Sequence, residues 1–312
     1  MPSQLFLLFV LFFLLAKAAD IIIVGIREIS EKLKVNLYVA GIMLGFFTSL
    51  PEMSIAWSAL ASRAVSVSSG NLYGGIIVLF GFILGLSLVA NRNVRTDGRW
   101  RSILPITLYL ALPVLLALDG VLGAIDSGIL ILGYFAVLSY TYLHHEPPAP
   151  SATGGLRRTS HETIAPELMT ILAGLMGVFL AAQLIVRTTI SILAFYPALP
   201  LFSVGLIVYA LGTNLPEIMV SIRSWRANIR ELSISNLLGS AITNGLIFGA
   251  TAFVMPTSIA QDAQYAVTGV AIIGILAVVT LAYHSHKNFS RTEGYALLLC
   301  YIAFLLASYL VS

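Results

Sequence analysis

The sequence predicts an all-α membrane protein with about ten transmembrane helices, arranged as two inverted repeats of five helices each. Three observations lead to this fold class: a composition dominated by apolar residues, an uneven distribution of basic residues, and a short motif that occurs twice. The composition indicates that the chain lies in a bilayer. The distribution of basic residues indicates how many times it crosses the membrane, and the repeated motif indicates that its two halves are related by symmetry.

Apolar residues make up 58% of the 312 positions, and charged residues only 10%. Soluble domains carry about 45–50% apolar and about 25% charged residues, so the excess indicates insertion into a bilayer. The basic residues are spread over short connections rather than gathered on one face, which argues against nucleic-acid binding. The single cysteine, Cys300, excludes an intrachain disulfide and a cysteine-based metal cluster.

Ten apolar segments are long enough to cross a bilayer, which takes about 20 helical residues. The first segment is similar to a signal peptide. However, no basic residue precedes it and apolar residues resume beyond it, so we expect one retained helix. The predicted spans are 4–26, 36–62, 70–90, 103–118, 122–143, 166–187, 199–224, 231–254, 264–283 and 293–311.

A polar connector follows the fifth span and divides the chain. It contains several prolines, a glycine pair and an arginine pair, which is the composition of a linker. The sequence therefore predicts a first five-helix repeat at residues 1–143, a linker at 144–165 and a second five-helix repeat at 166–312.

Basic residues separate the two sides that ten spans would define. Fourteen Lys and Arg residues lie in the connections after odd-numbered spans, whereas only Arg63 and Arg187 lie in those after even-numbered spans. Cytoplasmic loops are enriched in Lys and Arg. This asymmetry therefore predicts a multi-pass protein of the cell membrane, with both termini outside and the linker in the cytoplasm.

A five-residue motif occurs once in each half. TSLPE at residues 48–52 returns as TNLPE at 213–217, and NLYG at 71–74 returns as NLLG at 236–239, with one offset common to both pairs. Because each half holds an odd number of spans, the second copy must insert upside down. Inverted repeats are a transporter architecture, with the binding site at the repeat interface near the middle of the bilayer.

Each copy of the motif ends in an acid, Glu52 or Glu217, in the middle of a span. A carboxylate at the bilayer centre costs roughly 2.5–3.5 kcal/mol, so an acid there indicates a function. No Lys or Arg lies within the ten residues before either glutamate, which argues against a simple buried ion pair.

A proline precedes each acid. Pro51 and Pro216 each kink the helix and remove one backbone donor, which frees the carbonyl four residues earlier. These carbonyls belong to Phe47 and Gly212, and those of the neighbouring Thr48 and Thr213 are expected to loosen as well. Freed carbonyls are tolerated within a membrane where they line a cavity or bind an ion. With two carboxylates they form a set of hard oxygen ligands, which suits Ca²⁺. Two negative charges balance one Ca²⁺, two monovalent cations or two protons, so competing cations can drive exchange.

Further oxygen atoms come from the third and eighth spans. Asn71 follows Glu52 at the same spacing at which Asn236 follows Glu217. Contact with an ion and hydrogen bonding between helices would both explain these asparagines. Ser240 and Asn244 add two more polar side chains in the eighth span.

The doubled TSLPE/TNLPE motif, with the NLYG and NLLGS segments, resembles the repeats of the sodium/calcium exchanger, or cation/calcium antiporter, superfamily. The resemblance covers about residues 41–81 and 206–249. It implies that the two glutamates bind Ca²⁺ with backbone oxygens of the two threonines. It also implies Na⁺ sites near Ser49 and Asn214 and at Ser240. The candidate site residues are Glu52, Glu217, Thr48, Thr213, Ser49, Asn214, Asn71, Asn236, Ser240 and Asn244.

Four positions depart from the pattern of that superfamily, among them Ala241 after Ser240 and Phe47 before Thr48, where Gly is usual. Gly75 lacks the serine hydroxyl that the resemblance implies, and Leu79 stands where a polar residue is usual. The outer and middle monovalent-ion sites therefore lose oxygens on one side. Coupling to three Na⁺, to fewer Na⁺, to H⁺ or to a different cation all stay open.

We expect a secondary active antiporter, and not an enzyme, that exchanges Ca²⁺ for Na⁺ by alternating access. Exchange for H⁺, a cation channel and a transport-inactive homologue stay open as alternatives. We expect no permanently bound cofactor, with transported Ca²⁺ and a Na⁺ or H⁺ counter-ion. The expected partners are inorganic cations and the lipid bilayer, and the expected state is a monomer.

Overall fold

The computed structural model describes residues 2–33, 37–90, 94–95, 98–144, 165–195, 200–226, 230–285 and 288–311. The linker predicted at 144–165 lies outside these residues except for its two end positions. The helices are α1 (Pro2–Leu33), α2 (Leu37–Thr48), α3 (Leu50–Ala61), α4 (Val65–Ile77), the π-helix η1 (Val78–Leu84), α5 (Gly85–Ala90), α6 (Trp100–Leu116), the 3₁₀-helix η2 (Ala117–Asp119), α7 (Ala124–His144), α8 (Ala165–Leu193), α9 (Leu201–Val204), the π-helix η3 (Gly205–Tyr209), α10 (Ala210–Thr213), α11 (Leu215–Arg226), α12 (Arg230–Val254), α13 (Ala263–Ser285) and α14 (Arg291–Val311).

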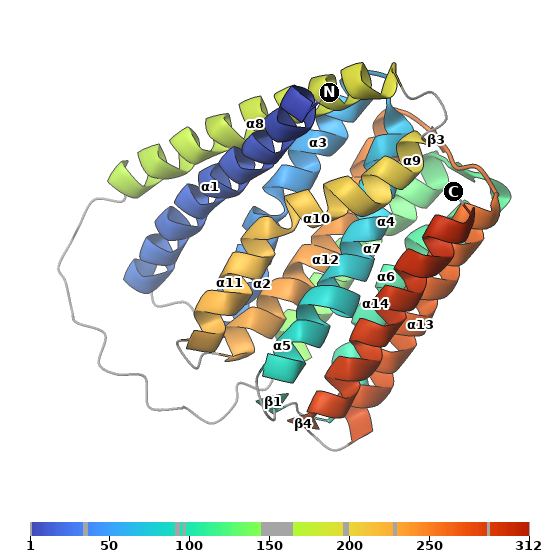
Figure 1. Ribbon diagram of the computed structural model, residues 1–312. Coiled ribbons are helices and arrows are strands. Elements are labelled where there is room, and N and C mark those ends of the chain that lie inside the picture. Colours follow the sequence, from blue (N-terminus) through green and yellow to red (C-terminus); the bar gives the residue numbers. More distant parts are fainter. Residues whose placement is uncertain are drawn as a thin grey trace.

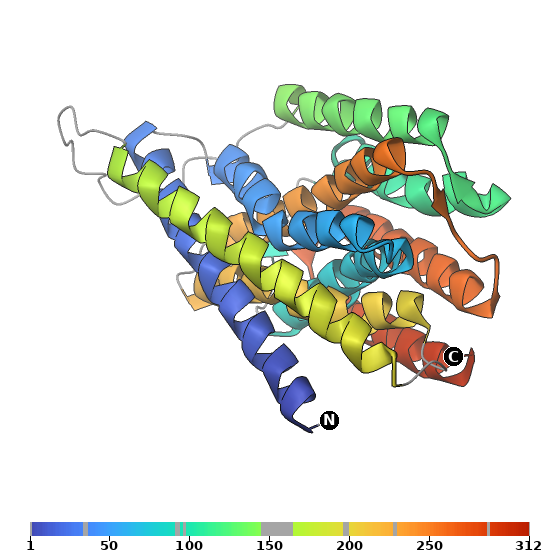
Figure 2. The same cartoon turned by 90° about the horizontal axis from the view of Figure 1, so that it is seen from above.

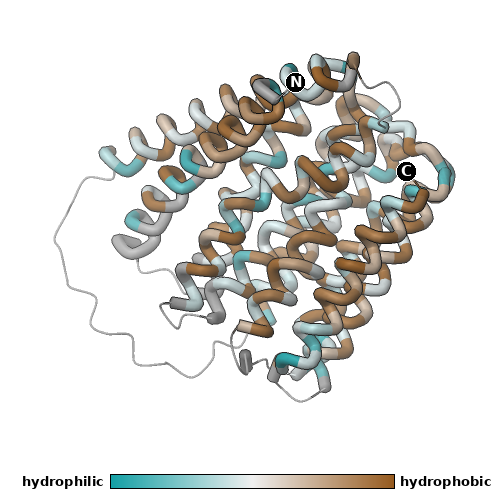
Figure 3. Tube along the Cα trace, in the orientation of Figure 1, coloured by the Kyte–Doolittle hydropathy of each residue, from teal (hydrophilic) through white to brown (hydrophobic). Residues whose placement is uncertain are grey.

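The predicted fold class is confirmed. Nine helices among the described residues are long and apolar enough to cross a membrane. The predicted span 36–62 consists of two shorter helices, α2 and α3. Apolar residues run along the helices, and hydrophilic residues gather toward their ends (Figure 3).

Three predicted span ends are wrong by five or more residues. The span 4–26 is too short, because α1 continues to Leu33 and so includes Arg27 and Lys32, and the span 70–90 begins too late, because α4 starts at Val65.

The span 166–187 is also too short, because α8 continues to Leu193. Arg187 therefore lies within a helix, with an exposed side chain, and not in a connection. The apolar sequence continues after this arginine, and a long basic side chain on the helix surface can extend toward the interface.

The two longest helices, α1 and α8, lie side by side along one flank of the molecule (Figures 1 and 2). Both are first helices of their halves, and of the rest of the bundle α8 packs mainly on α3. Apolar side chains such as Leu15, Ile55 and Ile185 form a cluster between these helices. A second and larger cluster fills the space among α4, η1, α6, α12 and α13.

The two halves interlock crosswise. In the first half, α2 packs against α12 of the second half, and in the second half α9 and η3 pack against α4 of the first. Glycines allow these crossings: a Cβ atom at Gly45 would lie 2.5 Å from the Ser240 nitrogen, and one at Gly74 would collide with the Leu206 carbonyl oxygen. Backbone therefore meets backbone at both crossings, which brings the polar residues of the two halves together.

Both predicted helix interruptions are present. The helical path breaks at Ser49 between α2 and α3, and at Asn214 between α10 and α11. Their ψ angles are 5° and 9°, outside the helical range, and in each case a proline is the second residue of the next helix. The two breaks are related by the same offset as the two copies of the sequence motif.

The π-helical segments η1 and η3 do not follow the repeat. The repeat offset relates η3 to residues 40–44 in α2, and η1 to residues 243–249 in α12, both ordinary α-helix. A π-helical turn is frequent at functional positions, and it shifts the faces of the residues that follow it. Neither segment was predicted, because hydrophobic periodicity does not resolve single wide turns.

Two ribbons of paired strands connect the halves at opposite ends of the bundle. β1 (Val94–Arg95) pairs antiparallel with β4 (Asn288–Phe289), and β2 (Val121–Leu122) pairs antiparallel with β3 (Thr257–Ser258). Both chain termini lie at the end that carries β3, away from β1 and β4 (Figure 1). This placement agrees with an even number of crossings.

The glycine crossing gives a testable prediction. Gly74→Ala places a methyl group against the Leu206 backbone. Backbone atoms within a helix cannot rotate away as the end of a side chain can. We expect a destabilisation of about 1–3 kcal/mol or more, measured by unfolding of the purified protein in mixed micelles. Gly274→Ala in α13 is the control, because nothing lies within 4 Å of its Cβ position. Equal stability of the two variants would contradict the close crossing.

Candidate functional site

The structure gathers the candidate residues at the breaks and on the adjoining helices. Each of the ten has an exposed side-chain fraction of 1% or less. Thr48 ends α2, Thr213 ends α10, and the two glutamates lie in the first turns of α3 and α11. α4 carries Asn71, whereas α12 carries Asn236, Ser240 and Asn244.

The two carboxylates lie within electrostatic reach of each other, since the charge of Glu52 acts on Glu217. On each glutamate, the Oε2 atom is buried and has no hydrogen-bond partner in the described structure. The ion pair found among the described residues joins Lys17 and Asp20, which are not part of this group. Two buried carboxyl groups therefore share one region without a basic partner from the described chain.

Threonine and asparagine side chains connect the halves in a crosswise pattern. The Thr48 hydroxyl lies 3.4 Å from the Asn236 Oδ1 atom, and the Thr213 hydroxyl donates to the Asn71 Oδ1 atom at 3.2 Å. Each threonine also interacts with the carboxylate of the other half, Thr48 with Glu217 and Thr213 with Glu52. Asn71 and Asn236 therefore bond between helices, one of the two roles that the sequence left open.

Ser240 occupies one side of the site. Its hydroxyl lies 3.0 Å from Glu217 Oε1, 3.1 Å from the Gly45 carbonyl oxygen and 2.9 Å from the Thr48 hydroxyl. Ser49 donates to the same Gly45 carbonyl at 2.9 Å. Oxygen atoms from both halves therefore converge on this side.

The opposite side of the site, which the repeat relates to the Ser240 side, is lined by different residues. Gly75 stands where the repeat places Ser240, and a Cβ atom there would lie 2.7 Å from Asn244 Nδ2 and 3.6 Å from Asn214 Nδ2. The Asn214 amide nitrogen donates to the Ala210 carbonyl at 2.7 Å, and its Oδ1 atom has no partner in the described structure. Both amide atoms of Asn244 also lack partners there. The absence of a side chain at position 75 thus makes room for an amide.

Sequence reasoning missed two carbonyl groups. Those of Gly45 and Ala210 accept hydrogen bonds from side chains one helical turn later, at Ser49 and Asn214. The two carbonyls are themselves related by the repeat offset, so the repeat contained a signal for them. The two prolines give no signal for them, because each proline frees the carbonyl four residues earlier, which belongs to Phe47 or Gly212.

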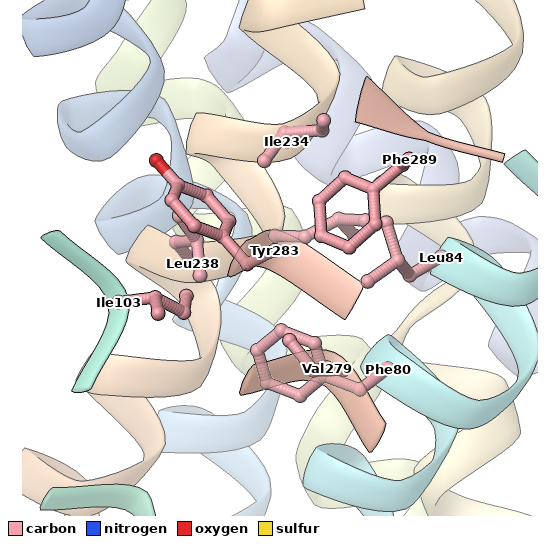
Figure 4. A pocket seen from close by; sticks show the side chains of 9 residues that line it. Phe80, Leu84, Ile103, Ile234, Leu238, Val279, Tyr283 and Phe289 are labelled. Carbon is pink, nitrogen blue, oxygen red and sulfur yellow. The ribbon is translucent and has the colours of Figure 1, made fainter. Parts of the chain in front are cut away.

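A separate pocket lies elsewhere in the fold and is apolar. Phe80, Leu84, Val279 and Phe289 are among its lining residues, and Figure 4 shows hydrocarbon side chains around it together with Tyr283, which carries a hydroxyl group. None of the ten candidate residues lines it. Apart from Tyr283, its lining side chains carry no oxygen that could bind a cation.

Within the described ranges, no group of three or more His, Cys, Asp or Glu residues is placed to hold a metal ion. A cation between Glu52 and Glu217 would need neutral oxygens to complete its coordination. Hydroxyl, carbonyl and amide oxygens are the type of ligand that hard cations accept.

Comparison with known proteins identifies the family. The sequence model of the family described as sodium/calcium exchanger protein matches residues 3–143 and 167–310. The chain belongs to this sodium/calcium exchanger family. As a member, it is a multi-pass membrane protein of a cation antiporter family.

Relatives and a solved structure extend this result. An uncharacterized membrane protein of Methanocaldococcus jannaschii is 25% identical over 295 residues, 93% of this chain and 92% of that protein. The putative antiporter CaxA of Alkalimonas amylolytica is 24% identical over 307 residues, 93% of this chain and 94% of that protein. A structure of the sodium-calcium exchanger NCX_Mj superposes with a TM-score of 0.71 at 23% identity, over 98% of this chain and 99% of that chain. The exchanger-family protein therefore has the inverted-repeat fold of that structure.

A double-mutant cycle tests the contact between Gly75 and Asn244. Gly75→Ala forces the Asn244 amide to move, and we expect a destabilisation of about 1–3 kcal/mol. Asn244→Ala removes the obstacle, so the double variant should regain most of the loss, with a coupling of about 0.5–3 kcal/mol in micellar unfolding. Gly128→Ala, with open space around its Cβ position, should be additive with Asn244→Ala. Additivity in the Gly75 cycle as well would refute the contact.

Proposed function

We propose that this protein is a secondary active antiporter that exchanges Ca²⁺ for Na⁺ through a site between Glu52 and Glu217. The observation that carries the proposal is the pair of buried carboxylates, each with an oxygen that has no hydrogen-bond partner in the described chain. Burying such charges without compensation is costly, and a divalent cation supplies the compensation. The description of the family and the name of the sodium-calcium exchanger NCX_Mj support exchange of these ions.

Neutral oxygens complete the proposed Ca²⁺ site. Thr48 and Thr213 are the last residues before the two helix breaks, and in this proposal their backbone oxygens face the ion. Asn71 and Asn236 hold the threonine hydroxyls from the opposite half. In this proposal the carboxylates and backbone oxygens bind Ca²⁺, and the two asparagines position the threonines.

Monovalent cations would bind beside the Ca²⁺ site. On one side, Ser240, Ser49 and the Gly45 carbonyl offer oxygens next to Glu217. On the other side, Asn214 and Asn244 offer amide oxygens, and Gly75 offers none. We therefore propose Na⁺ as the counter-ion on the Ser240 side, with H⁺ as the alternative that protonates the same carboxylates.

The proposed placement in the cell follows the distribution of basic residues. Both termini face outward, and the linker at 144–165 lies in the cytoplasm of a cell-membrane protein. Five helices in residues 1–143 and five in 166–312 form the two repeats. Both termini lie at one end of the bundle, which is consistent with this topology (Figure 1).

Neutralising one acid tests the site. We expect Glu52→Gln or Glu217→Gln to reduce ⁴⁵Ca²⁺ uptake into proteoliposomes to the level of protein-free liposomes, because one of two compensating charges is lost. Asp119→Asn is the control, since this exposed acid lies in η2 at the end of the bundle and should leave uptake unchanged. Normal uptake by Glu52→Gln would reject the two-glutamate site.

Imposed gradients identify the counter-ion and the transport class. Uptake driven by an outward Na⁺ gradient at equal pH supports Na⁺ exchange, whereas uptake driven only by a pH gradient supports H⁺ exchange. Flux that proceeds equally without either gradient would indicate a channel, which needs no exchanged ion. Absence of both flux and Ca²⁺ binding by calorimetry would indicate a transport-inactive homologue.

A further inference from the structure

The helices that follow the two glutamates differ between the repeats in a way that the shared fold does not require. In the second half, Glu217, Ser221 and Ser224 recur at spacings of four and three positions, which places them on one face of α11. Ser233, Asn236 and Ser240 recur in the same manner on α12. The two helices pack against each other, so two polar stripes can meet.

Hydrogen bonds show that these stripes do meet. Ser240 donates to Glu217 at 3.0 Å near the break, and Ser233 donates to Ser221 at 3.0 Å, one turn further along α11. Ser221, Ser224 and Ser233 are 0%, 4% and 2% exposed. We name Glu217, Ser221, Ser224, Ser233, Asn236 and Ser240 the α11–α12 seam. It extends from the buried carboxylate toward the end of the bundle that carries β1 and β4 (Figure 1).

The equivalent interface between α3 and α4 lacks three of these polar groups. At the positions related by the repeat, Ala56 replaces Ser221, Ala59 replaces Ser224, and Gly75 replaces Ser240. Ser68, the equivalent of Ser233, is 2% exposed, and its hydroxyl has no partner in the described structure. Ala56 provides no hydroxyl for it, whereas Ser221 does so for Ser233. At these three positions the first half has alanine or glycine where the seam has serine, and the buried serine hydroxyls of α3 and α4 lie elsewhere, at Ser58, Ser68 and Ser69.

We propose that the α11–α12 seam is a one-sided path by which water and small hydrated cations reach Glu217, and that the α3–α4 interface is no such path. Hydroxyls at successive turns replace part of the hydration shell of a cation, whereas alanines do not. Glu217 Oε2 and Asn236 Nδ2 are buried polar atoms within the seam without partners in the described chain. The inference rests on the proposed function, because it concerns access to the same carboxylate.

Matched cysteines test this path. In a Cys300→Ala background, Ser221→Cys and Ala56→Cys place thiols at positions related by the repeat, both 0% exposed. The probe is 2-(trimethylammonium)ethyl methanethiosulfonate, a membrane-impermeant cation, added to either side of oriented vesicles. We expect Ser221→Cys to react at least about tenfold faster than Ala56→Cys, because the rate follows the population of the opened path. Its reaction should occur from the side of the α11–α12 connection.

Equal rates for the two cysteines, or no reaction of Ser221→Cys from either side, would overturn the proposed path. Added Ca²⁺ should slow the reaction of Ser221→Cys. If Ser221→Cys reacts from one side only and Ca²⁺ does not change the rate, the result supports the path but argues against Ca²⁺ as the ion at Glu217. The experiment can therefore reject either proposal without rejecting the other.

Ser221→Ala and Ala56→Ser provide a second pair in case a cysteine variant does not fold. Ser221→Ala copies the first repeat and should slow ⁴⁵Ca²⁺ uptake several-fold, whereas Ala56→Ser supplies a partner for Ser68 and should not slow it. Equal uptake by both variants, at matched thermal stability, would also overturn the path.

Discussion

Two carboxylates buried near one another, without a basic partner in the described chain, are the constraint on which the rest of this structure depends. Acids in this position repel each other and lose their hydration. The surrounding architecture limits that cost. The helices break at Ser49 and Asn214, next to the acids in the chain, and the Thr48 and Thr213 hydroxyls bond to Asn236 and Asn71 of the opposite half. The arrangement is stable as a permanent state only with cations or protons bound.

Much of this arrangement could be predicted from the sequence, because it follows from strong local signals. Long apolar runs indicate the helices, and the doubled motif with its prolines indicates the two breaks and the two acids. The close approach of Gly75 and Asn244 could not be predicted, since it depends on how α4 and α12 pack. The π-helical segments and the strand ribbons were missed because two-residue strands and single wide turns leave no periodic pattern. Arg187 was misplaced because a basic residue on a helix surface resembles a helix end.

The two repeats share a scaffold but differ in side-chain chemistry. The crossings at Gly45 and Gly74 are equivalent in position and bring backbone against backbone in both halves. Around them, Ser240 binds three oxygen atoms on one side, whereas Gly75 admits an amide on the other. The close packing of backbones at these crossings keeps the two halves symmetric, because moving one helix would disturb many contacts at once. Single side chains are free to diverge, so ion selectivity can change while the fold is retained.

The paired strands have a consequence for how the chain is assembled. Each ribbon takes one strand from either side of the linker, and the ribbons sit at opposite ends of the bundle. Crossed helices between them bury one glutamate from each half in a common interface. Neither half on its own would cover its acid or complete its ribbons. The halves are thus obligate partners, and a pair of separately synthesised fragments contains all the contacts that hold the described fold together.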